Sequence, residues 1–231
     1  MSQYRFLYAD GRGAAEVVRM AFALAGKSAD LEDVRYPIDI SKFPTGGLDA
    51  ACPTFVEERA KGKHVANLNR LQILEVIEGG VTTSIGETPA IERFVGKRMG
   101  LMGSNDIEYA LIDAICEHLR DIRQEYMNAK KEDKFKPVES GPTAVDTFFS
   151  EKLKVWMGKL ENCFGNGGFA VGSSVSIADL RMHHFVKEFF DNKEAVAAAI
   201  ASSPKITASV AAVEADANIA KYIAERKPTP F

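Results

Sequence analysis

The sequence predicts an α/β domain followed by an all-helical domain, because its hydrophobic pattern changes near residue 100. Residues 1–99 alternate short apolar runs with helical patterns, in the order βαβ and then ββα. Residues 104–231 carry only helical patterns, in which apolar side chains recur three and four positions apart. We therefore predict two domains, 1–99 and 104–231, with the joint between Gly100 and Asn105.

The α/β domain is expected to hold a small sheet and the helices that connect its strands. The expected strands are Tyr4–Tyr8, Leu31–Tyr36, Leu71–Val76 and Val81–Ser84, and the expected helices are Ala14–Ala25 and Pro89–Met99. Gly79 and Gly80 follow Glu78 as a turn signal, so the last two strands should form a hairpin. Residues 37–70 hold prolines, glycines and a charged run, and we expect a loop with a short helix there.

The helical domain begins with a long amphipathic pattern. Helices are expected over Asp106–Lys130 and Thr143–Phe164, with the polar stretch Lys131–Pro142 as the loop between them. Ser176 and Asp179 have the spacing of a capping box, so a further helix should begin at that serine. Two final helices are expected after these, and they should open at Ser203-Pro204 and at Asp216.

Composition limits the classes of function. The net charge is −3 and no basic block is present, so nothing favours binding to nucleic acid or to an anionic membrane. No apolar run approaches the roughly 18 residues of a membrane span. The three cysteines are widely spaced without a zinc pattern, and His183 and His184 face apart on a helix, so no metal site is expected. The sparse cysteines and the polar N-terminal stretch favour a cytoplasmic location.

Two short segments carry candidate chemistry. Tyr8 ends an apolar strand just before a glycine-rich turn and a helix, where its phenol is placed to hydrogen-bond a thiolate. A donor that favours the charged form of a thiol lowers its pKa, by about 1.4 kcal/mol per pKa unit. Tyr4 lies on the same strand and is interpreted as core. Thr88 before Pro89 looks like a helix cap, and a helix N-terminus attracts a carboxylate. Taken without a wider context, this segment is better explained as a plain helix cap beside a surface acid, Glu87.

Three stretches of sequence, in the right order, resemble cytosolic glutathione S-transferases, especially tyrosine-type classes such as sigma. The stretches are Tyr8-(x)3-Arg12-Gly13-Ala14-Ala15-Glu16-(x)2-Arg19, then Leu71–Val76 with Gly86-Glu87-Thr88-Pro89-Ala90-Ile91, and then Gly168 to Asp179 with its Ser176-Ile-Ala-Asp179 motif. The resemblance implies a thioredoxin-like first domain that binds glutathione. It also implies a helical domain that lines a pocket for small hydrophobic electrophiles, a homodimer, and glutathione as co-substrate with no further cofactor.

The resemblance also implies roles for individual residues. Tyr8 would donate its hydroxyl proton to the glutathione sulfur, while Thr88 and Glu87 would bind the γ-glutamyl carboxylate and ammonium. Leu71 would pair its backbone with the cysteinyl part. Arg70 would meet the glycyl carboxylate or remain solvated, and Glu117 would reach the glutathione of the partner subunit.

Three departures from the family pattern keep other functions open. Gln72 replaces a cis-proline, so we expect a trans or strained peptide bond there. Ala14 replaces an arginine, and residues 37–70 form a longer connection than usual. The alternatives are a catalytically weak binding or structural protein of the S-crystallin kind, or a glutathione-dependent isomerase or peroxidase.

Overall fold

The structure, a computed structural model, describes residues 3–135 and 140–229. Within these residues the chain divides into two compact units. The first holds the residues up to Met99 together with those from Asn218 onward, and the second is Gly100–Ala217. An α/β unit and a helical unit are the expected fold class, which is confirmed. The C-terminal residues pack with the first unit, although their helical pattern had assigned them to the second.

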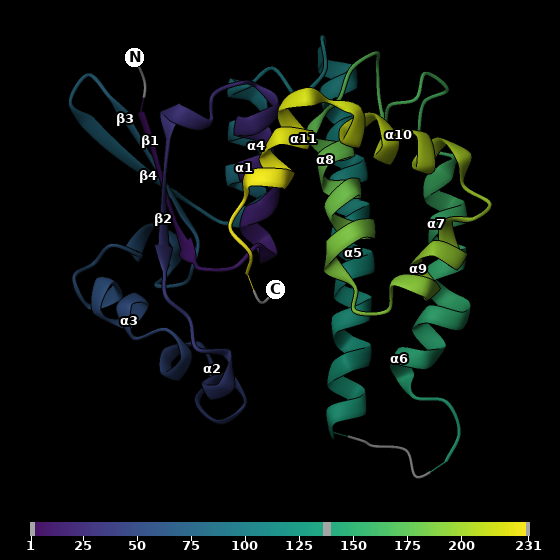
Figure 1. Cartoon of the computed structure of the whole chain (residues 1–231), viewed down its shortest axis with the longest axis horizontal. Coiled ribbons are helices and arrows are strands. Elements are labelled where there is room, and N and C mark those ends of the chain that lie inside the picture. The colour runs from purple at the N-terminus through teal and green to yellow at the C-terminus, as the bar shows by residue number, and fades with distance from the viewer. Residues whose placement is uncertain (1–2, 136–139, 230–231) are drawn as a thin grey trace. The chain divides into compact units, whose positions relative to one another are not determined.

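The first unit is built on a four-stranded sheet of order β2-β1-β3-β4. β1 pairs in parallel with β2, and β3 pairs antiparallel with both β1 and β4. Helix α1 provides the crossover between the two parallel strands, and α4 lies with α1 on one face of the sheet (Figure 1). The strands are β1 (Gln3–Ala9), β2 (Leu31–Tyr36), β3 (Ile73–Glu78) and β4 (Val81–Gly86), and the helices are α1 (Glu16–Leu24), α4 (Thr88–Arg98) and the C-terminal α11 (Ala217–Glu225).

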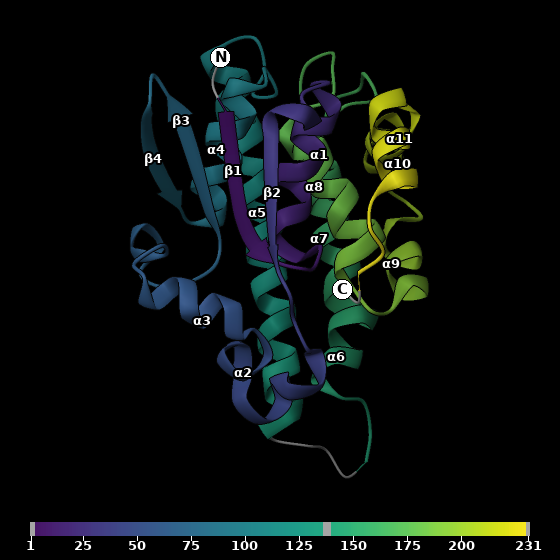
Figure 2. The ribbon, with the colours of Figure 1, turned by 60° about the vertical axis from the view of Figure 1, so that its left-hand side comes forward.

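Residues 37–70 are more helical than the sequence indicated. They form α2 (Phe43–Ala51) and α3 (Pro53–Ala60), which are visible beside the sheet in Figure 2. The expectation of one short helix was wrong because the prolines here open helices, with Pro44 and Pro53 in the first turns. Gly47 has a φ of 62° and interrupts α2.

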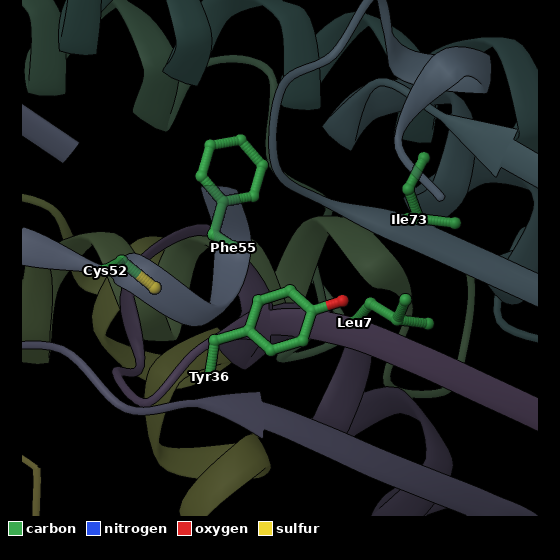
Figure 3. Close-up of a cluster of buried hydrophobic side chains, with 5 residues drawn as sticks. All are labelled: Leu7, Tyr36, Cys52, Phe55 and Ile73. Atoms are coloured by element: carbon green, nitrogen blue, oxygen red, sulfur yellow. The ribbon is translucent and has the colours of Figure 1, made fainter. Parts of the chain in front are cut away.

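A buried apolar cluster joins this helical segment to the sheet. Figure 3 shows its members, which come from β1, β2, α3 with its preceding residue, and β3: Leu7, Tyr36, Cys52, Phe55 and Ile73. Phe55 is 1% exposed and anchors α3, since burying a phenylalanine side chain contributes about 1.5–3 kcal/mol. The long connection is thus part of the core of the first unit.

The prediction that a strand begins at Leu71 was wrong. The strand begins at Ile73, so Leu71 lies just before it and is not a strand residue. The Leu71–Gln72 peptide bond, expected to be trans or strained because no proline follows, is cis.

The second unit contains helices α5 to α10. They are α5 (Asp106–Phe135), α6 (Ala144–Thr147), α7 (Leu153–Glu161), α8 (Ile177–His184), α9 (Lys193–Ile200) and α10 (Pro204–Ala215). π-helical turns occupy Phe148–Lys152 between α6 and α7, and Phe185–Phe189 after α8. The expected helix over 143–164 is therefore formed in three pieces.

The helix starts in this unit follow the sequence closely, whereas its first loop does not. The Ser176–Asp179 capping box is formed, and Pro204 opens α10. α5 continues to Phe135, so the expected loop over 131–142 is helical in its first part, and residues 136–139 lie outside the described residues. No helix among the described residues is both long enough and apolar enough to cross a membrane.

Candidate functional site

Tyr8 and Tyr4 share strand β1 but have different surroundings. Tyr4 is 6% exposed and packs edge-on against Phe22, with 5.0 Å between ring centroids, so its assignment to the core is confirmed. Tyr8 is partly exposed near the end of the strand. A Cβ placed on Gly13 would lie 3.0 Å from the Tyr8 hydroxyl oxygen, and Gly13 has a φ of +37°. The glycine therefore leaves room for the phenol at the start of the first helix.

Arg19 holds the turn that follows Tyr8. Its buried guanidinium donates to the Gly11 carbonyl at 2.6 Å and to the two carboxylate oxygens of Asp33 at 3.0 and 3.1 Å. Arg35 donates to the same carboxylate at 2.7 Å. These bonds fix the turn between β1 and α1 to strand β2, and with it the position of Tyr8.

The C-terminal segment, residues 217–229, contacts both the start of α1 and the turn before it. Glu16 is 1% exposed and accepts a hydrogen bond from the Tyr222 hydroxyl at 3.1 Å and another from Arg226. Burial, followed by the charge of Glu16, raises the pKa of Tyr222. Lys227 pairs with Asp10 in the turn itself. No sequence pattern predicts these contacts, because the partners are more than 200 positions apart and no local motif relates them.

Two buried amides organise the start of α4. Asn67 accepts from the Glu87 backbone N–H at 3.1 Å and donates to the Gln72 carbonyl at 3.0 Å. Gln72 donates through Nε2 to the Thr88 hydroxyl at 2.9 Å and to the Ala14 carbonyl at 3.4 Å. Glu87, with a φ of 66°, occupies the N-cap position, and Thr88 is the first helical residue instead of the expected cap.

Some of the residues predicted to bind glutathione in this unit contact one another. Arg70 and Glu87 form an ion pair, and each side chain is 57% exposed. The sequence had assigned them to opposite ends of the tripeptide. Leu71 is partly buried against the apolar cluster of Figure 3. Thr88 is partly exposed beside Glu87 at the helix N-terminus, where free N–H groups favour an anion.

Other predicted positions lie in the helical unit. Glu117 is on α5 and pairs with Arg120 one turn later, and its role toward a partner subunit stays a prediction. His183 is buried, with its Nε2 3.4 Å from a carboxylate oxygen of Glu214, and burial lowers its pKa. Among residues 3–135 and 140–229, no group of three or more His, Cys, Asp or Glu side chains is arranged to hold a metal ion.

Comparisons with known proteins agree with this architecture. A family model described as the C-terminal domain of glutathione S-transferase matches residues 120–226. The chain is 27% identical to a probable glutathione S-transferase 6 of Caenorhabditis elegans and 25% identical to S-crystallin SL11 of Nototodarus sloanii, with full coverage of both chains in each case. The solved structure of monomeric Na-GST-3, a glutathione S-transferase of the hookworm Necator americanus, has a TM-score of 0.72 at 26% identity, and the match covers 99% of this chain and 100% of that one.

Proposed function

The chain belongs to the cytosolic glutathione S-transferase family, and on that premise we propose that it conjugates glutathione to small hydrophobic electrophiles. The observation that carries the proposal is the placement of Tyr8. Its ring stands at the end of β1 beside Gly13 and is partly exposed, whereas the Tyr4 ring is core. No hydrogen bond joins the Tyr8 hydroxyl to another side chain in the described part of the chain, so this donor is available to a ligand.

Tyr8 acts on the sulfur of glutathione as a hydrogen-bond donor. An O–H aimed at a thiolate stabilises the charged form and lowers the pKa of the thiol, at about 1.4 kcal/mol per pKa unit. The thiolate is the nucleophile, so a larger thiolate fraction at neutral pH raises the rate of attack on an electrophile. The electrophile supplies the leaving group or the addition site, and no cofactor beyond glutathione is part of this proposal.

The rest of the tripeptide binds along the edge of the first unit. Thr88 and the N-terminus of α4 receive the γ-glutamyl carboxylate, and Glu87 accepts from the ammonium. Leu71 pairs through its backbone with the cysteinyl part. Arg70 must leave Glu87 to reach the glycyl carboxylate. Because both side chains are 57% exposed, breaking their ion pair costs about 1 kcal/mol or less.

The decisive test compares Tyr8→Phe with Tyr4→Phe, the same change on the same strand. Tyr8→Phe should lower kcat/KM for conjugation of an aryl halide by about a hundredfold or more, as for loss of one donor to a developing charge. It should also raise the apparent pKa of the bound thiol, read from thiolate absorbance. Tyr4→Phe should leave both values unchanged. An unaltered rate in Tyr8→Phe would remove this residue from the mechanism.

We also propose a cytoplasmic homodimer in which Glu117 contacts the glutathione of the partner subunit. Sedimentation would give the subunit number. Glu117→Gln should weaken glutathione binding in the dimer, and the exposed Asp121→Asn on the same helix is the matched control. A monomer with full affinity would reject this part of the proposal without touching the role of Tyr8.

The second candidate is a glutathione-binding or structural protein with little turnover. The 25% identity to an S-crystallin over the full chain favours it, as do Gln72 and Ala14 at positions where the family has proline and arginine. Calorimetry separates the candidates, because saturable glutathione binding without conjugation of any tested electrophile supports this version. Turnover with hydroperoxides or isomerisable substrates alone would instead identify a glutathione-dependent peroxidase or isomerase.

A further inference from the structure

Gln72 links three parts of the first unit that border the candidate site. Its side chain is 1% exposed. Nε2 lies 2.9 Å from the Thr88 hydroxyl oxygen at the start of α4 and 3.4 Å from the Ala14 carbonyl in the turn that follows Tyr8. The main-chain carbonyl of Gln72 accepts from the side-chain amide nitrogen of Asn67. The amide oxygen of Asn67 in turn accepts from the Glu87 backbone N–H. One glutamine thus contacts both ends of the proposed glutathione-binding edge.

The direction of these bonds follows from the partners. The Ala14 carbonyl only accepts hydrogen bonds, so the amide nitrogen of Gln72 must face it and Thr88. The Thr88 oxygen then accepts from Gln72, and the single hydroxyl proton of Thr88 remains for a different acceptor. Thr88 is partly exposed, and it stands where the N–H groups of α4 attract an anion. Its proton is therefore available to an acceptor on a ligand, such as a carboxylate oxygen.

The side-chain amide oxygen of Gln72, Oε1, is a second unusual feature of this residue. Oε1 is buried and has no hydrogen-bond partner among the described residues. A buried acceptor without a partner is costly, so the bonds from Nε2 must compensate for it. The unpartnered Oε1 therefore belongs to the same side chain that fixes the Thr88 hydroxyl. Unsatisfied buried polar atoms of this kind are often found at functional sites.

We propose that Gln72 is a positioning residue for recognition of the α-carboxylate of the γ-glutamyl group. It orients the Thr88 hydroxyl as a donor to this carboxylate, and through Ala14 it couples the start of α4 to the turn that follows Tyr8. The inference rests on the proposed function, since glutathione is the ligand, but it assigns a task to a residue that never touches the tripeptide.

The test compares two ligands on one variant. Gln72→Met keeps the side-chain length and removes the donor. Calorimetry would measure the Kd of glutathione and of γ-aminobutyryl-cysteinyl-glycine, which lacks the α-carboxylate. Gln72→Met should weaken glutathione about tenfold to thirtyfold, as for a hydrogen bond to a charged group, and should change the analogue less than threefold. Gln124→Leu, an exposed change at a glutamine bonded to Asn128 on α5, is the control and should alter neither Kd.

Thr88 variants complete the cycle and guard against misfolding of Gln72→Met. Thr88→Val should show the same selective loss for glutathione, Thr88→Ser should restore the binding, and the double variant should be no weaker than Thr88→Val, because both changes remove one interaction. Equal weakening of the two ligands by Gln72→Met would mean a structural role only and would overturn the inference. So would a Thr88→Val variant that still prefers glutathione as strongly as the parent does. If the parent binds neither ligand, the proposed function itself fails, which is a distinct result.

Discussion

Glu16 in the first unit and Asp179 in the second are both buried carboxylates near the start of a helix, but their partners differ. Asp179 is 0% exposed and accepts from the Ala170 N–H at 2.7 Å, from the Ser176 N–H and hydroxyl at 2.9 and 2.7 Å, and from the Ser209 hydroxyl at 2.6 Å. Glu16 is 1% exposed; one of its carboxylate oxygens accepts from Tyr222 and Arg226 of the C-terminal segment, and the other lies 3.9 Å from Arg19 without a hydrogen bond among the described residues.

The difference shows two solutions to the cost of burying a charge. Around Asp179, neutral dipoles from the same loop and helix, with one distant serine, surround the carboxylate. Around Glu16, a cation more than 200 positions away compensates for the charge. The first solution organises a helix start within one unit. The second ties the end of the chain to the start of α1, just after the turn that follows Tyr8, so it connects stability to the candidate site.

Loss of Asp179 should have the largest effect of the changes that test this comparison. Asp179→Ala strands two buried backbone N–H groups and two hydroxyls, and we expect the free energy of unfolding to fall by about 3–5 kcal/mol. Asp179→Asn should lose less because one acceptor remains. Fluorescence of Trp156, the chain's single tryptophan, would follow unfolding of the helical unit. Asp121→Ala, at an exposed position on α5, is the control, and an equal loss there would contradict the argument.

Loss of the Glu16 partner should have the next largest effect. Arg226→Met leaves the buried Glu16 carboxylate with the Tyr222 hydroxyl and with Arg19 at 3.9 Å. We therefore expect the free energy of unfolding to fall by about 1–2 kcal/mol. Hydrogen exchange of α1 would report it. Lys221→Met on the same C-terminal helix is exposed and should have little effect. The double variant Glu16→Gln with Arg226→Met should be no less stable than Arg226→Met, because the unpaired charge is removed.

The same contrast explains how much could be predicted from the sequence. Ser176 and Asp179 were found because a capping box is local, and the succession of strands and helices along the chain followed from local patterns. Tyr222 and Arg226 could not be found, because no pattern relates a helix near residue 220 to a turn near residue 16. The prolines of residues 37–70 were misinterpreted, because proline marks both loops and helix starts, and burial of Phe55 decides between them.

The candidate site was predicted in the same uneven way. Tyr8, Glu87 and Thr88 were chosen from motifs, and the structure places the last two side by side at the start of α4. The role of Gln72 was not foreseen, because the sequence showed only a missing proline. Its bonds to Ala14 and Thr88 depend on three segments meeting in the folded unit. Tertiary contacts of this kind leave no trace in spacing.

Alkaline pH should destabilise the first unit, which holds the Glu16 cluster, by a smaller amount and should leave the Asp179 cluster unaffected. Burial and the charge of Glu16 raise the pKa of Tyr222, and burial raises the pKa of Tyr36 to about 12. Both phenols ionise more readily in the unfolded chain, so their contribution is complete below about pH 10 and is lost above it. The free energy of unfolding of the first unit should fall by about 1.4 kcal/mol per pH unit for each tyrosine.

Tyr222→Phe tests the share of this slope that belongs to the Glu16 cluster. The variant should reduce the slope measured by hydrogen exchange of α1 between about pH 10 and 11 by about 1.4 kcal/mol per pH unit, and Tyr36→Phe should reduce it by a similar amount. Hydrogen exchange of the loop that donates to Asp179 should respond to neither variant. The partners of Asp179 are backbone N–H groups and serine hydroxyls, which do not ionise between about pH 10 and 11. A slope unchanged by Tyr222→Phe would mean that its phenol is not protected as its contacts indicate.

The smallest effect is expected at the exposed end of the same C-terminal segment. Burial would raise the pKa of Asp10, but Lys227 and Arg35 outweigh it and the pKa is lowered, so this pairing stabilises above the usual carboxyl range and is lost as the pH falls. Lys227 is 62% exposed, so Lys227→Gln should cost only about 0.5 kcal/mol at neutral pH and almost nothing in 1 M salt. The loss from Arg226→Met should persist in salt, since its partner is buried. If 1 M salt abolished the losses from Lys227→Gln and from Arg226→Met equally, the Glu16–Arg226 pair would behave as a surface ion pair. It would then differ from the Asp179 cluster only in the sequence separation of its partners.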